Sequence, residues 1–440
     1  MAKLLMTVWP IETHSSGFIP VARALRDRGH RVAFYTGSEL QLKLEREGFR
    51  VFPFRELDDS FSRCNPGSAL TPKMGPRARL AAWQNFLLGS VPGQLQDLER
   101  IGSEWQPDGM VCDMTMWGPI LVLHETVPLP VAVLAHTAYC IIPGRENPAP
   151  GISLPRPGNR RMRLAARILS WGFGRLSAGV PREANRIRRQ YGLRPLSGTV
   201  VDFTGRMPLY LVPSAPEFDY ERRDLPKCVH YIGPCVSAGE MTPAQARTGR
   251  PHVLVVDEVH GNDPQLLSIA AQAFAGSAVE LTLLVRRGRD LAQLEPAVRA
   301  PNVRVEPWVP LRQAVPAADV MVADGHSETV LAALSRGVPL VIVPRMLEQP
   351  QVAWRVVASG AGIRLPVRRC TPQRLREAVE RVIASEWFSR NARRMAAALA
   401  RRGGAARAAD WIEAMLASNS RPSHEAAAGR ELSHSGVTTH

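Results

Sequence analysis

An alternation of strand and helix patterns over the first 54 residues constrains the fold of this chain more than any other feature. Strand-like apolar runs occur at residues 4–8, at residues 31–35 and near Val51. Between them lie a helix from about Pro20 that ends at Gly29 and a Ser38-capped helix that ends at Gly48. Because a helix connects each pair of strands, the strands are expected to run parallel, as in one half of a doubly wound sheet. Further strands are predicted at residues 109–112, 130–134 and 209–212.

The same alternation restarts in the second half of the chain. Strands are predicted at residues 252–256, 280–285, 302–306, 320–323 and 339–343, with helices among them and continuing to about residue 418. The segment 233–251, rich in Gly, Pro, Ser and Thr, shows no periodicity and is predicted to be a linker. The sequence therefore predicts an α/β protein of two Rossmann-like doubly wound domains that face a cleft, the natural place for a ligand.

The predicted domains divide the chain at the linker. We expect residues 1–232 to form the first domain and residues 252–418 the second, whose last helix is a candidate for packing back on the first domain. Residues 419–440 are polar and rich in Ala, Gly and Ser, so they are predicted to be disordered. With 440 residues, of which 45% are hydrophobic and 22% charged, the chain is long enough for two hydrophobic cores.

The net charge of +15 comes from two segments. Residues 151–195 hold eleven Arg and one Glu, and residues 371–407 hold nine Arg and three Glu, so the remainder is close to neutral. A nucleic-acid binder would pair such a basic surface with stacking aromatic side chains, but only 6% of the residues are aromatic. Nucleic acid is therefore not expected as a partner.

The cysteines and the hydropathy pattern point to a cytoplasmic protein. The six cysteines lack the close pairs of zinc and redox motifs, which is typical of thiols in a reducing compartment: Cys64, Cys112, Cys140, Cys228, Cys235 and Cys370. The first apolar run reaches Pro10 too early for a signal peptide. No run approaches the roughly 18 apolar residues that a membrane span needs.

The loop after the first strand excludes the usual dinucleotide motif. A nicotinamide or flavin domain needs Gly-x-Gly-x-x-Gly there, but the loop from Trp9 to Pro20 contains a single glycine, Gly17. The chain also lacks the Gly-x-x-x-x-Gly-Lys-Ser/Thr motif of P-loop proteins. The first domain is therefore expected to bind a less phosphorylated ligand.

Four segments in order along the chain resemble a known family. They are residues 26–34 (Arg-Asp-Arg-Gly-His-Arg-Val-Ala-Phe), 230–235 (His-Tyr-Ile-Gly-Pro-Cys), 302–310 (Asn-Val-Arg-Val-Glu-Pro-Trp-Val-Pro) and the block 323–353. Over roughly residues 3 to 417 the chain resembles the GT-B fold glycosyltransferases of the UDP-glycosyltransferase superfamily, especially the bacterial macrolide- and antibiotic-type enzymes.

The resemblance implies a function for each domain. The first would bind a lipophilic acceptor, and the second a nucleotide-diphosphate sugar, a UDP- or dTDP-sugar, as co-substrate. A His in the first loop, supported by an Asp, would deprotonate the acceptor hydroxyl for direct displacement at the anomeric carbon. Since a helix N-terminus and a His can stabilise the leaving diphosphate, neither a metal nor a cofactor is expected.

The family's base position falls on Gly17, three residues before Pro20. Two explanations remain open: either His14, one turn earlier, acts as the base with Asp113 in Cys-Asp-Met-Thr-Met-Trp, or the base has been lost. A histidine can titrate near neutral pH, which favours the first explanation. A solvated loop histidine and an aspartate that caps the next helix are the alternatives without a catalytic role.

The expected donor site departs further from the family pattern. The diphosphate-binding His of the turn aligns with Asp324, the ribose-binding Glu with Ala332 and a Gln with Leu311, while Asp257 and Glu258 add acids to a neighbouring loop. A carboxylate at position 324 would repel a phosphate at close range. The remaining candidate donor-binding residues are Trp308 for stacking on the base, Gly325, His326, Ser327 and Thr329 in the turn, and Glu348 and Gln349 for the sugar.

The turn itself allows three interpretations. Asp324, His326 and Glu328 could converge on a metal if the loop were extended, although three ligands without a fourth are weak evidence. Alternatively, His326 replaces the lost phosphate contact from two residues away. In the third interpretation the loop has drifted, and Ser327 or Thr329 only caps the following helix.

Residues 159–176 form a basic amphipathic pattern. Arg160, Arg163 and Arg167 recur at helical spacing beside an apolar stripe of Leu164, Ile168 and Trp171. Three interpretations compete: a helix half in the core and half in solvent, a lid over a lipophilic acceptor, and a peripheral membrane contact through residues 159–190.

Two hypotheses follow. In the first, the protein is an inverting, metal-independent hexosyltransferase that uses a UDP- or dTDP-sugar and a hydroxyl group of a lipophilic natural product. In the second, it is a GT-B scaffold without transferase activity, which serves as an auxiliary protein or catalyses another step on an apolar small molecule. The replacements at Gly17, Asp324 and Ala332 motivate the second hypothesis.

Overall fold

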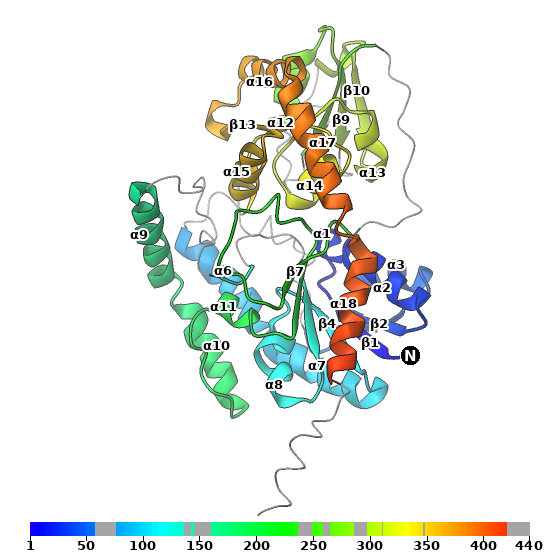
Figure 1. The fold of residues 1–440 in the computed structure, drawn as a ribbon, viewed down its shortest axis with the longest axis vertical. Helices are drawn as coiled ribbons and strands as arrows, with labels where there is room; N and C mark the ends of the chain where they lie inside the picture. Colours follow the sequence, from blue (N-terminus) through cyan, green and yellow to red (C-terminus); the bar gives the residue numbers. More distant parts are fainter. Residues whose placement is uncertain are drawn as a thin grey trace, which may run out of the picture.

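The computed structural model describes residues 1–57, 76–135, 142–144, 160–235, 249–257, 265–285, 297–309, 311–345 and 348–419. These residues form two α/β domains stacked along the long axis of the molecule (Figure 1). Residues 236–248 of the predicted linker, the tail from residue 420 and Glu258 lie outside the described residues. The prediction of two parallel-sheet α/β domains is confirmed.

The first domain is built on a seven-stranded sheet with the order β3-β2-β1-β4-β5-β6-β7. Every neighbouring pair of these strands is parallel. The strands are β1(Lys3–Thr7), β2(Arg31–Thr36), β3(Arg50–Pro53), β4(Gly109–Asp113), β5(Val131–Leu134), β6(Leu209–Val212) and β7(Val229–Tyr231). The chain first builds outward from β1 to β3 and then returns to β4 on the other side of β1. The topological switch point therefore lies between β1 and β4.

The described helices of the first domain include the two predicted from about Pro20 and from Ser38. They are α1(Glu12–Ser15), α2(Phe18–Asp27), α3(Ser38–Arg46), α6(Pro76–Gly89), α7(Val91–Trp105), η1(Pro119–Leu123), α8(His124–Thr126), α9(Arg160–Leu176), α10(Gly179–Gln190) and α11(Val200–Thr204). In α2, Phe18, Val21, Ala22 and Leu25 recur at spacings of three and four and are all buried, so this face packs on the sheet. Gly29 ends the helix region at φ +87°, a left-handed conformation that suits glycine.

The second domain repeats the plan with a six-stranded parallel sheet in the order β10-β9-β8-β11-β12-β13. Its strands are β8(His252–Val256), β9(Glu280–Val285), β10(Val303–Pro307), β11(Val320–Ala323), β12(Leu340–Ile342) and β13(Gly362–Arg364). Its helices are α12(Gln265–Phe274), η4(Ala297–Arg299), α13(Leu311–Ala314), η5(Val315–Ala317), α14(Ser327–Ser335), α15(Gln349–Ser359), η6(Val367–Arg369), α16(Pro372–Ala384), α17(Glu386–Ala400) and α18(Gly404–Asn419). The switch point here lies between β8 and β11.

Local details differ from the sequence-based prediction. Ser38 does not cap its helix: Gly37 is the N-cap residue of α3, in extended conformation, and no side chain caps the helix. The loop expected from Trp9 to Pro20 contains the one-turn helix α1. The strands β7 and β13 were not predicted, because runs of three residues are too short to show an alternating pattern.

The described cysteines carry no disulfide: Cys112 and Cys370 are buried free thiols, and Cys228 and Cys235 are half-buried ones. Burial raises the pKa of the Cys235 thiol to about 12, so this thiol stays protonated at neutral pH. Cys64 and Cys140 lie outside the described residues.

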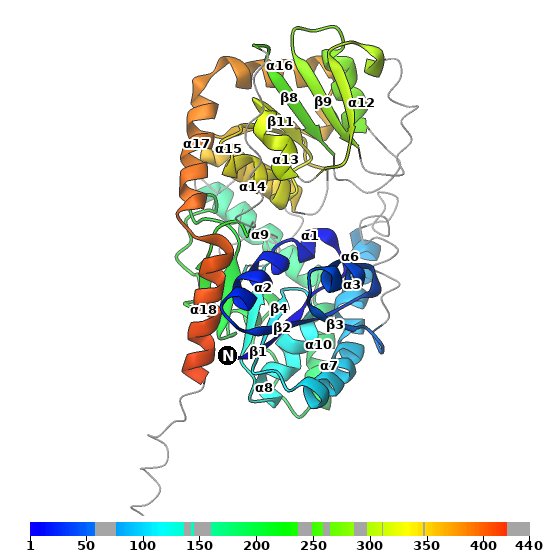
Figure 2. The same cartoon turned by 90° about the vertical axis from the view of Figure 1, so that its right-hand side faces the viewer.

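Helix α18 follows α17 of the second domain and lies along the first domain (Figure 2). Its side chains Ala408, Ile412 and Met415 are buried in the same core cluster as Phe18 and Leu25 of α2. At the rim of this contact, the Arg28 guanidinium and the His30 imidazole each lie within 3 Å of the Glu413 carboxylate. The end of the described chain is therefore part of the first domain's core.

A buried ion pair also joins the two domains. Arg355 of α15 lies 2.7 Å, from Nη2 to Oδ1, from Asp219 in the segment between β6 and β7. Its Nε also donates to Oδ1 at 2.9 Å, and the Tyr231 hydroxyl donates to Oδ2 at 2.5 Å. The Arg355 guanidinium stacks over the Tyr220 ring at 4.4 Å. These bonds satisfy the charges that burial would otherwise leave unpaired.

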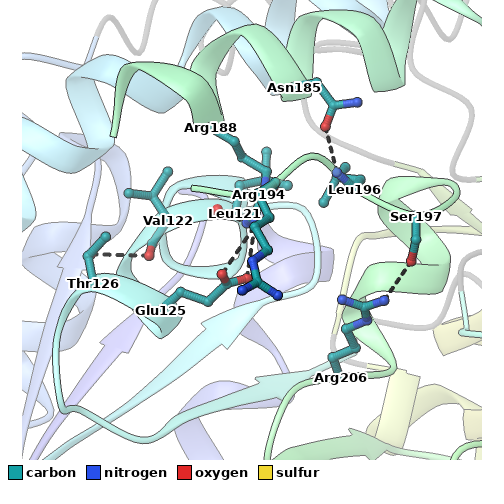
Figure 3. A network of polar contacts seen from close by, with 10 residues as sticks. All are labelled: Leu121, Val122, Glu125, Thr126, Asn185, Arg188, Arg194, Leu196, Ser197 and Arg206. Atoms are coloured by element: carbon teal, nitrogen blue, oxygen red, sulfur yellow. Dashed lines mark hydrogen bonds and ion pairs between the residues drawn. The ribbon is translucent and has the colours of Figure 1, made fainter. Parts of the chain in front are cut away.

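Arg188 attaches the arginine-rich arm formed by α9 and α10 to the first domain (Figure 3). It is almost fully buried at 2% exposure. Its guanidinium donates to the backbone carbonyls of Leu121 and Arg194 at 2.6 and 2.8 Å and forms an ion pair with Glu125 at 3.0 Å. Arg188 thus forms hydrogen bonds in the interior of the first domain, while the neighbouring arginine side chains of α10 are exposed.

We predict that Arg188→Met destabilises the protein by about 2–3 kcal/mol, because Glu125 and two buried carbonyls lose their donor. Urea unfolding followed by circular dichroism measures the change. Arg186→Met on the same helix is the matched control, since Arg186 is exposed and pairs with Glu183 on the same helix. A loss of stability equal to that of the control would contradict the anchoring role of Arg188.

Candidate functional site

The first half of the candidate site lies at the switch point of the first sheet. His14 belongs to α1, directly after β1, and Asp113 is the last residue of β4. The His14 Nδ1 and the Asp113 Oδ2 are 2.7 Å apart, with the imidazole largely covered and the carboxylate fully buried. The fold therefore brings together the two residues that the sequence analysis proposed as a pair.

Asp113 is held in a fixed orientation. Its Oδ1 accepts a hydrogen bond from the Thr115 backbone N–H at 2.7 Å and another from the Thr115 hydroxyl at 2.5 Å. With Oδ1 occupied in this way, Oδ2 points to the His14 ring. A carboxylate bonded to Nδ1–H fixes the tautomer in which Nε2 is the proton acceptor, which is the form required of a general base.

Gly17, where the family pattern places the base, has helical backbone angles and is the N-cap residue of α2. Among the described residues, a Cβ atom at this position would meet only the Cβ of Cys235, at 4.0 Å. The backbone conformation therefore does not require glycine, and no described residue crowds a Cβ there.

Aromatic side chains gather beside α1 at the carboxyl ends of β1 and β3. The Trp9 and Phe86 rings pack in a tilted arrangement, with centroids 4.4 Å apart and planes at 39°, and Trp9 forms an edge contact with Phe54 at a centroid distance of 5.9 Å. The Tyr35 and Phe54 rings form an edge contact with their centroids 4.7 Å apart. Trp9 and Tyr35 are fully buried, while Phe54 and Phe86 keep partial exposure. These rings thus form one aromatic cluster at the edge of the first sheet where β1 and β3 end.

The second half of the candidate site lies at the switch point of the second sheet. Asp324 follows β11, and both of its carboxylate oxygens are 3.1 Å from the His326 Nδ1. Burial alone would raise the pKa of Asp324, but the charge and hydrogen bonds of His326, together with the charge of Arg345, outweigh it and hold this pKa below its usual range. His326 and Arg345 therefore compensate the negative charge of Asp324. This compensation reduces the phosphate repulsion that was expected from the sequence.

Asp257, the other acid near this edge, is also paired. It follows β8, is buried, and lies 3.4 Å from the Arg345 Nη2. Gln349 connects the two pairs, because its Oε1 accepts the Arg345 backbone N–H at 2.9 Å and its Nε2 lies 3.3 Å from the His326 Nδ1. Arg345 was not among the residues predicted from the sequence. Its position just after β12 could have identified it, because ligands bind at the carboxyl ends of parallel strands.

The turn between β11 and α14 has a compact geometry. Gly325 has φ +99°, and a Cβ there would lie 2.9 Å from Ile342 Cγ2 and 3.3 Å from the Gln349 carbonyl oxygen. His326 is the N-cap residue of α14 without a side-chain cap, so neither Ser327 nor Thr329 caps this helix as the third interpretation required. The backbone N–H groups at the start of α14 lie beside the paired acid.

The metal interpretation required an extended loop, but Glu328 lies in the first turn of α14. Within the described part of the chain, no group of three or more His, Cys, Asp or Glu side chains could hold a metal ion.

The other predicted donor residues lie around this turn and at the sheet edge. Ser327 and Thr329 are buried on α14, and Gln349 is fully buried on α15. Glu348, the N-cap residue of α15, is half-buried. Trp308 is half-buried at the end of the edge strand β10, three strands from β11. Ala332 and Leu311 are half-buried on α14 and α13.

Both halves of the site lie where the two domains meet, with α1 and α14 on the facing sides (Figures 1 and 2). Two doubly wound domains with their switch points turned toward each other define a GT-B protein. The crystal structure titled as the glycotransferase of kitacinnamycin has this fold: it superposes with a TM-score of 0.75 at 22% identity, over 94% of this chain and 99% of that chain. A spinosyn rhamnosyltransferase complexed with thymidine diphosphate superposes with a TM-score of 0.65 at 18% identity, over 94% of this chain and all of that one.

Sequence comparison narrows the class to a family. Residues 278–415 match the model of the erythromycin biosynthesis protein CIII-like C-terminal domain. The chain is 31% identical over 427 residues to the 4'-demethylrebeccamycin synthase of Lentzea aerocolonigenes, covering 94% of this chain and 100% of that protein. The chain belongs to the bacterial antibiotic-type glycosyltransferases of the UDP-glycosyltransferase superfamily. It is therefore an enzyme of the glycosyltransferase class.

We predict that Gly325→Ala destabilises the second domain by about 1–3 kcal/mol, because the new Cβ adds a clash with Ile342 to an unfavourable φ. Thermal unfolding measures this loss. Gly276→Ala is the matched control, since Gly276 also has positive φ, +68°, but no atom of the described residues lies within 4 Å of a Cβ there. If the two variants lose the same stability, the close packing of the turn is not what requires Gly325.

Proposed function

We propose that this enzyme transfers a hexose from a UDP- or dTDP-sugar to a hydroxyl group of a lipophilic natural product, with inversion at the anomeric carbon and without a metal. The observation that carries the proposal is the hydrogen bond between His14 and the buried Asp113 at the switch point of the acceptor domain. An imidazole oriented by a buried carboxylate is suited to accept a proton from a hydroxyl group.

In the proposed step, the proton of the acceptor hydroxyl moves to His14 Nε2 while its oxygen attacks the anomeric carbon. The bond from that carbon to the diphosphate oxygen breaks at the same time, and the nucleoside diphosphate leaves with the bonding electrons. Attack opposite the leaving group inverts the anomeric configuration. Asp113 acts as a positioning residue that stabilises the imidazolium that forms.

The diphosphate would lie at the start of α14, where the helix N-terminus supplies backbone N–H donors and where His326, whose Nδ1 pairs with Asp324, would donate through Nε2. Arg345 is a second cation at this edge. These groups supply the stabilisation that a metal provides in other enzymes, which supports metal independence. Gly325 allows the close turn, Ser327 and Thr329 shape the start of α14, and Trp308 would stack on the base.

Glu348 and Gln349 divide the sugar-binding role in this proposal. Glu348 is half-buried and would accept hydrogen bonds from sugar hydroxyls. Gln349 is fully buried and holds His326 and the Arg345 backbone, so it would act through them. The lipophilic acceptor is supported by the aromatic cluster of Trp9, Phe54 and Phe86, which lies at the same edge of the first sheet as the end of β4.

Calorimetric titration with UDP and dTDP tests the donor part of the proposal. Binding of one of them in the micromolar to low millimolar range is expected, and the absence of binding of both at millimolar concentration overturns the donor proposal. With an identified acceptor, the coupling constant of the product's anomeric proton distinguishes inversion from retention. Turnover that persists in excess chelator supports metal independence, and turnover lost on chelation and restored by a divalent cation refutes it.

We predict that His14→Ala lowers kcat by about 100- to 10,000-fold, the range that a positioned general base contributes. The Kd of UDP or dTDP should stay unchanged, because His14 lies in the other domain. Turnover rates and calorimetry measure the two effects separately. Unchanged turnover would remove His14 from the mechanism.

Gly17→His in the His14→Ala background provides the matched control. No described residue crowds a Cβ at Gly17, and the family pattern places its base at this position. Partial recovery of turnover would show that the lost function is proton acceptance rather than local structure.

We predict that His326→Ala weakens UDP or dTDP binding by about 10- to 100-fold, as expected for one charge-assisted hydrogen bond to a diphosphate. Isothermal titration measures the Kd. In Glu348→Gln, the control, affinity for the nucleotide sugar should fall while affinity for the free nucleotide is kept. Equal losses for the free nucleotide in both variants would contradict the division of roles between His326 and Glu348.

A further inference from the structure

Helix α9 presents an apolar stripe to solvent. Leu164, Ile168 and Trp171 are 60%, 59% and 65% exposed. Their spacings of four and three residues place them on one side of the helix. A helix that is half in the core would bury such a stripe, and an acceptor lid would turn it toward the protein. The exposure of the stripe argues against both interpretations.

Arginines border the stripe on both sides. At about 100° per residue, Arg161 lies about 60° to one side of Leu164 and Arg167 about 60° to the other. Both arginines are exposed. The Arg175 guanidinium covers the Trp171 ring at 5.1 Å from its centroid. No Asp or Glu occurs in residues 151–182, so the whole helix is cationic.

We propose that α9 is a docking surface for anionic phospholipid bilayers. Charge complementarity selects this partner, because lipid headgroups supply dense negative charge and the acyl region accepts Leu, Ile and Trp side chains. Arginine stems can extend along the apolar surface while their guanidinium groups reach the phosphates. The helix lies on the bilayer in this arrangement. No described helix is long and apolar enough to cross a membrane.

A second copy of the chain fits the stripe less well. In a symmetric dimer through α9, the same surface meets itself, so Arg161 and Arg167 would face the arginines of the other copy. Such like-charge contacts disfavour the dimer.

The arm that carries α9 is attached to the first domain. In Figure 1, α9 lies at the left margin of the molecule and continues downward into α10. Figure 3 shows how Arg188 of α10 reaches the interior. A bilayer that binds α9 would thereby hold the first domain at the membrane surface. This arrangement does not depend on which sugar or acceptor the enzyme uses.

Co-sedimentation with lipid vesicles tests the proposal on the full chain. The protein should bind vesicles of phosphatidylcholine that contain about one third phosphatidylglycerol, and binding should weaken at high salt, as expected for headgroup attraction. Pure phosphatidylcholine vesicles should retain little protein. Equal binding to both vesicle types, or no binding to the anionic ones, overturns the proposal.

Two variants separate the apolar and charged contributions. The triple variant Leu164→Ser, Ile168→Ser, Trp171→Ser should lower the vesicle partition coefficient about tenfold or more. The double variant Arg161→Gln, Arg167→Gln should lower it about 25-fold, from a factor of about five for each arginine. Because all five side chains are exposed, folding should be kept, and circular dichroism verifies this.

The double variant Trp387→Ser, Arg390→Gln on α17 is the matched control. Trp387 is 59% exposed, and both residues lie in the other arginine-rich segment, where acidic residues are interspersed. This variant should bind vesicles like the unaltered protein, and an equal loss would reject α9 as the docking surface. Sedimentation analysis provides the last test: a dimer that the triple variant dissociates would assign the stripe to a second copy and overturn the proposal.

Discussion

The buried ion pair between Arg355 and Asp219 stabilises the orientation of the two domains relative to each other. The candidate site depends on this orientation because each domain supplies half of it. Neither charge has access to bulk water, so each is stable only while the other domain supplies its partner. The Tyr231 hydroxyl and the Tyr220 ring complete the shell around the pair. The pair therefore favours one arrangement of the two switch points, with α1 and α14 on facing sides.

A common pattern unites the chemistry at the two switch points. In each domain, an acid that follows a central strand is buried and paired with a cationic or titratable side chain: Asp113 with His14, Asp324 with His326, and Asp257 with Arg345. Because the carboxyl ends of parallel strands meet there, short loops can bring groups together from distant parts of the sequence. The acids at the second switch point thus belong to local pairs and do not form a region of uncompensated negative charge.

The fold could be predicted from the sequence because the hydrophobic periods of strands and helices are local properties. The ends of most predicted strands lie within a residue or two of the observed ones. The pair of His14 and Asp113 was predicted from the resemblance to the family. The compensation of Asp324 was not predicted, because it depends on the direction in which a tight turn points the His326 ring. Arg345 was missed because its partner, Asp257, is 88 residues away in the sequence. The two side chains come into contact only because β8 and β12 belong to the same sheet.

The return of α18 to the first domain limits how the enzyme can be divided or recombined. Ile412 and Met415 belong to the same apolar cluster as Phe18 and Leu25, although nearly the whole chain separates them. A fragment that stops at the linker would leave that side of α2 uncovered. An exchange of second domains between relatives therefore needs two junctions, one in the linker and one between α17 and α18, so that each recipient keeps its own final helix.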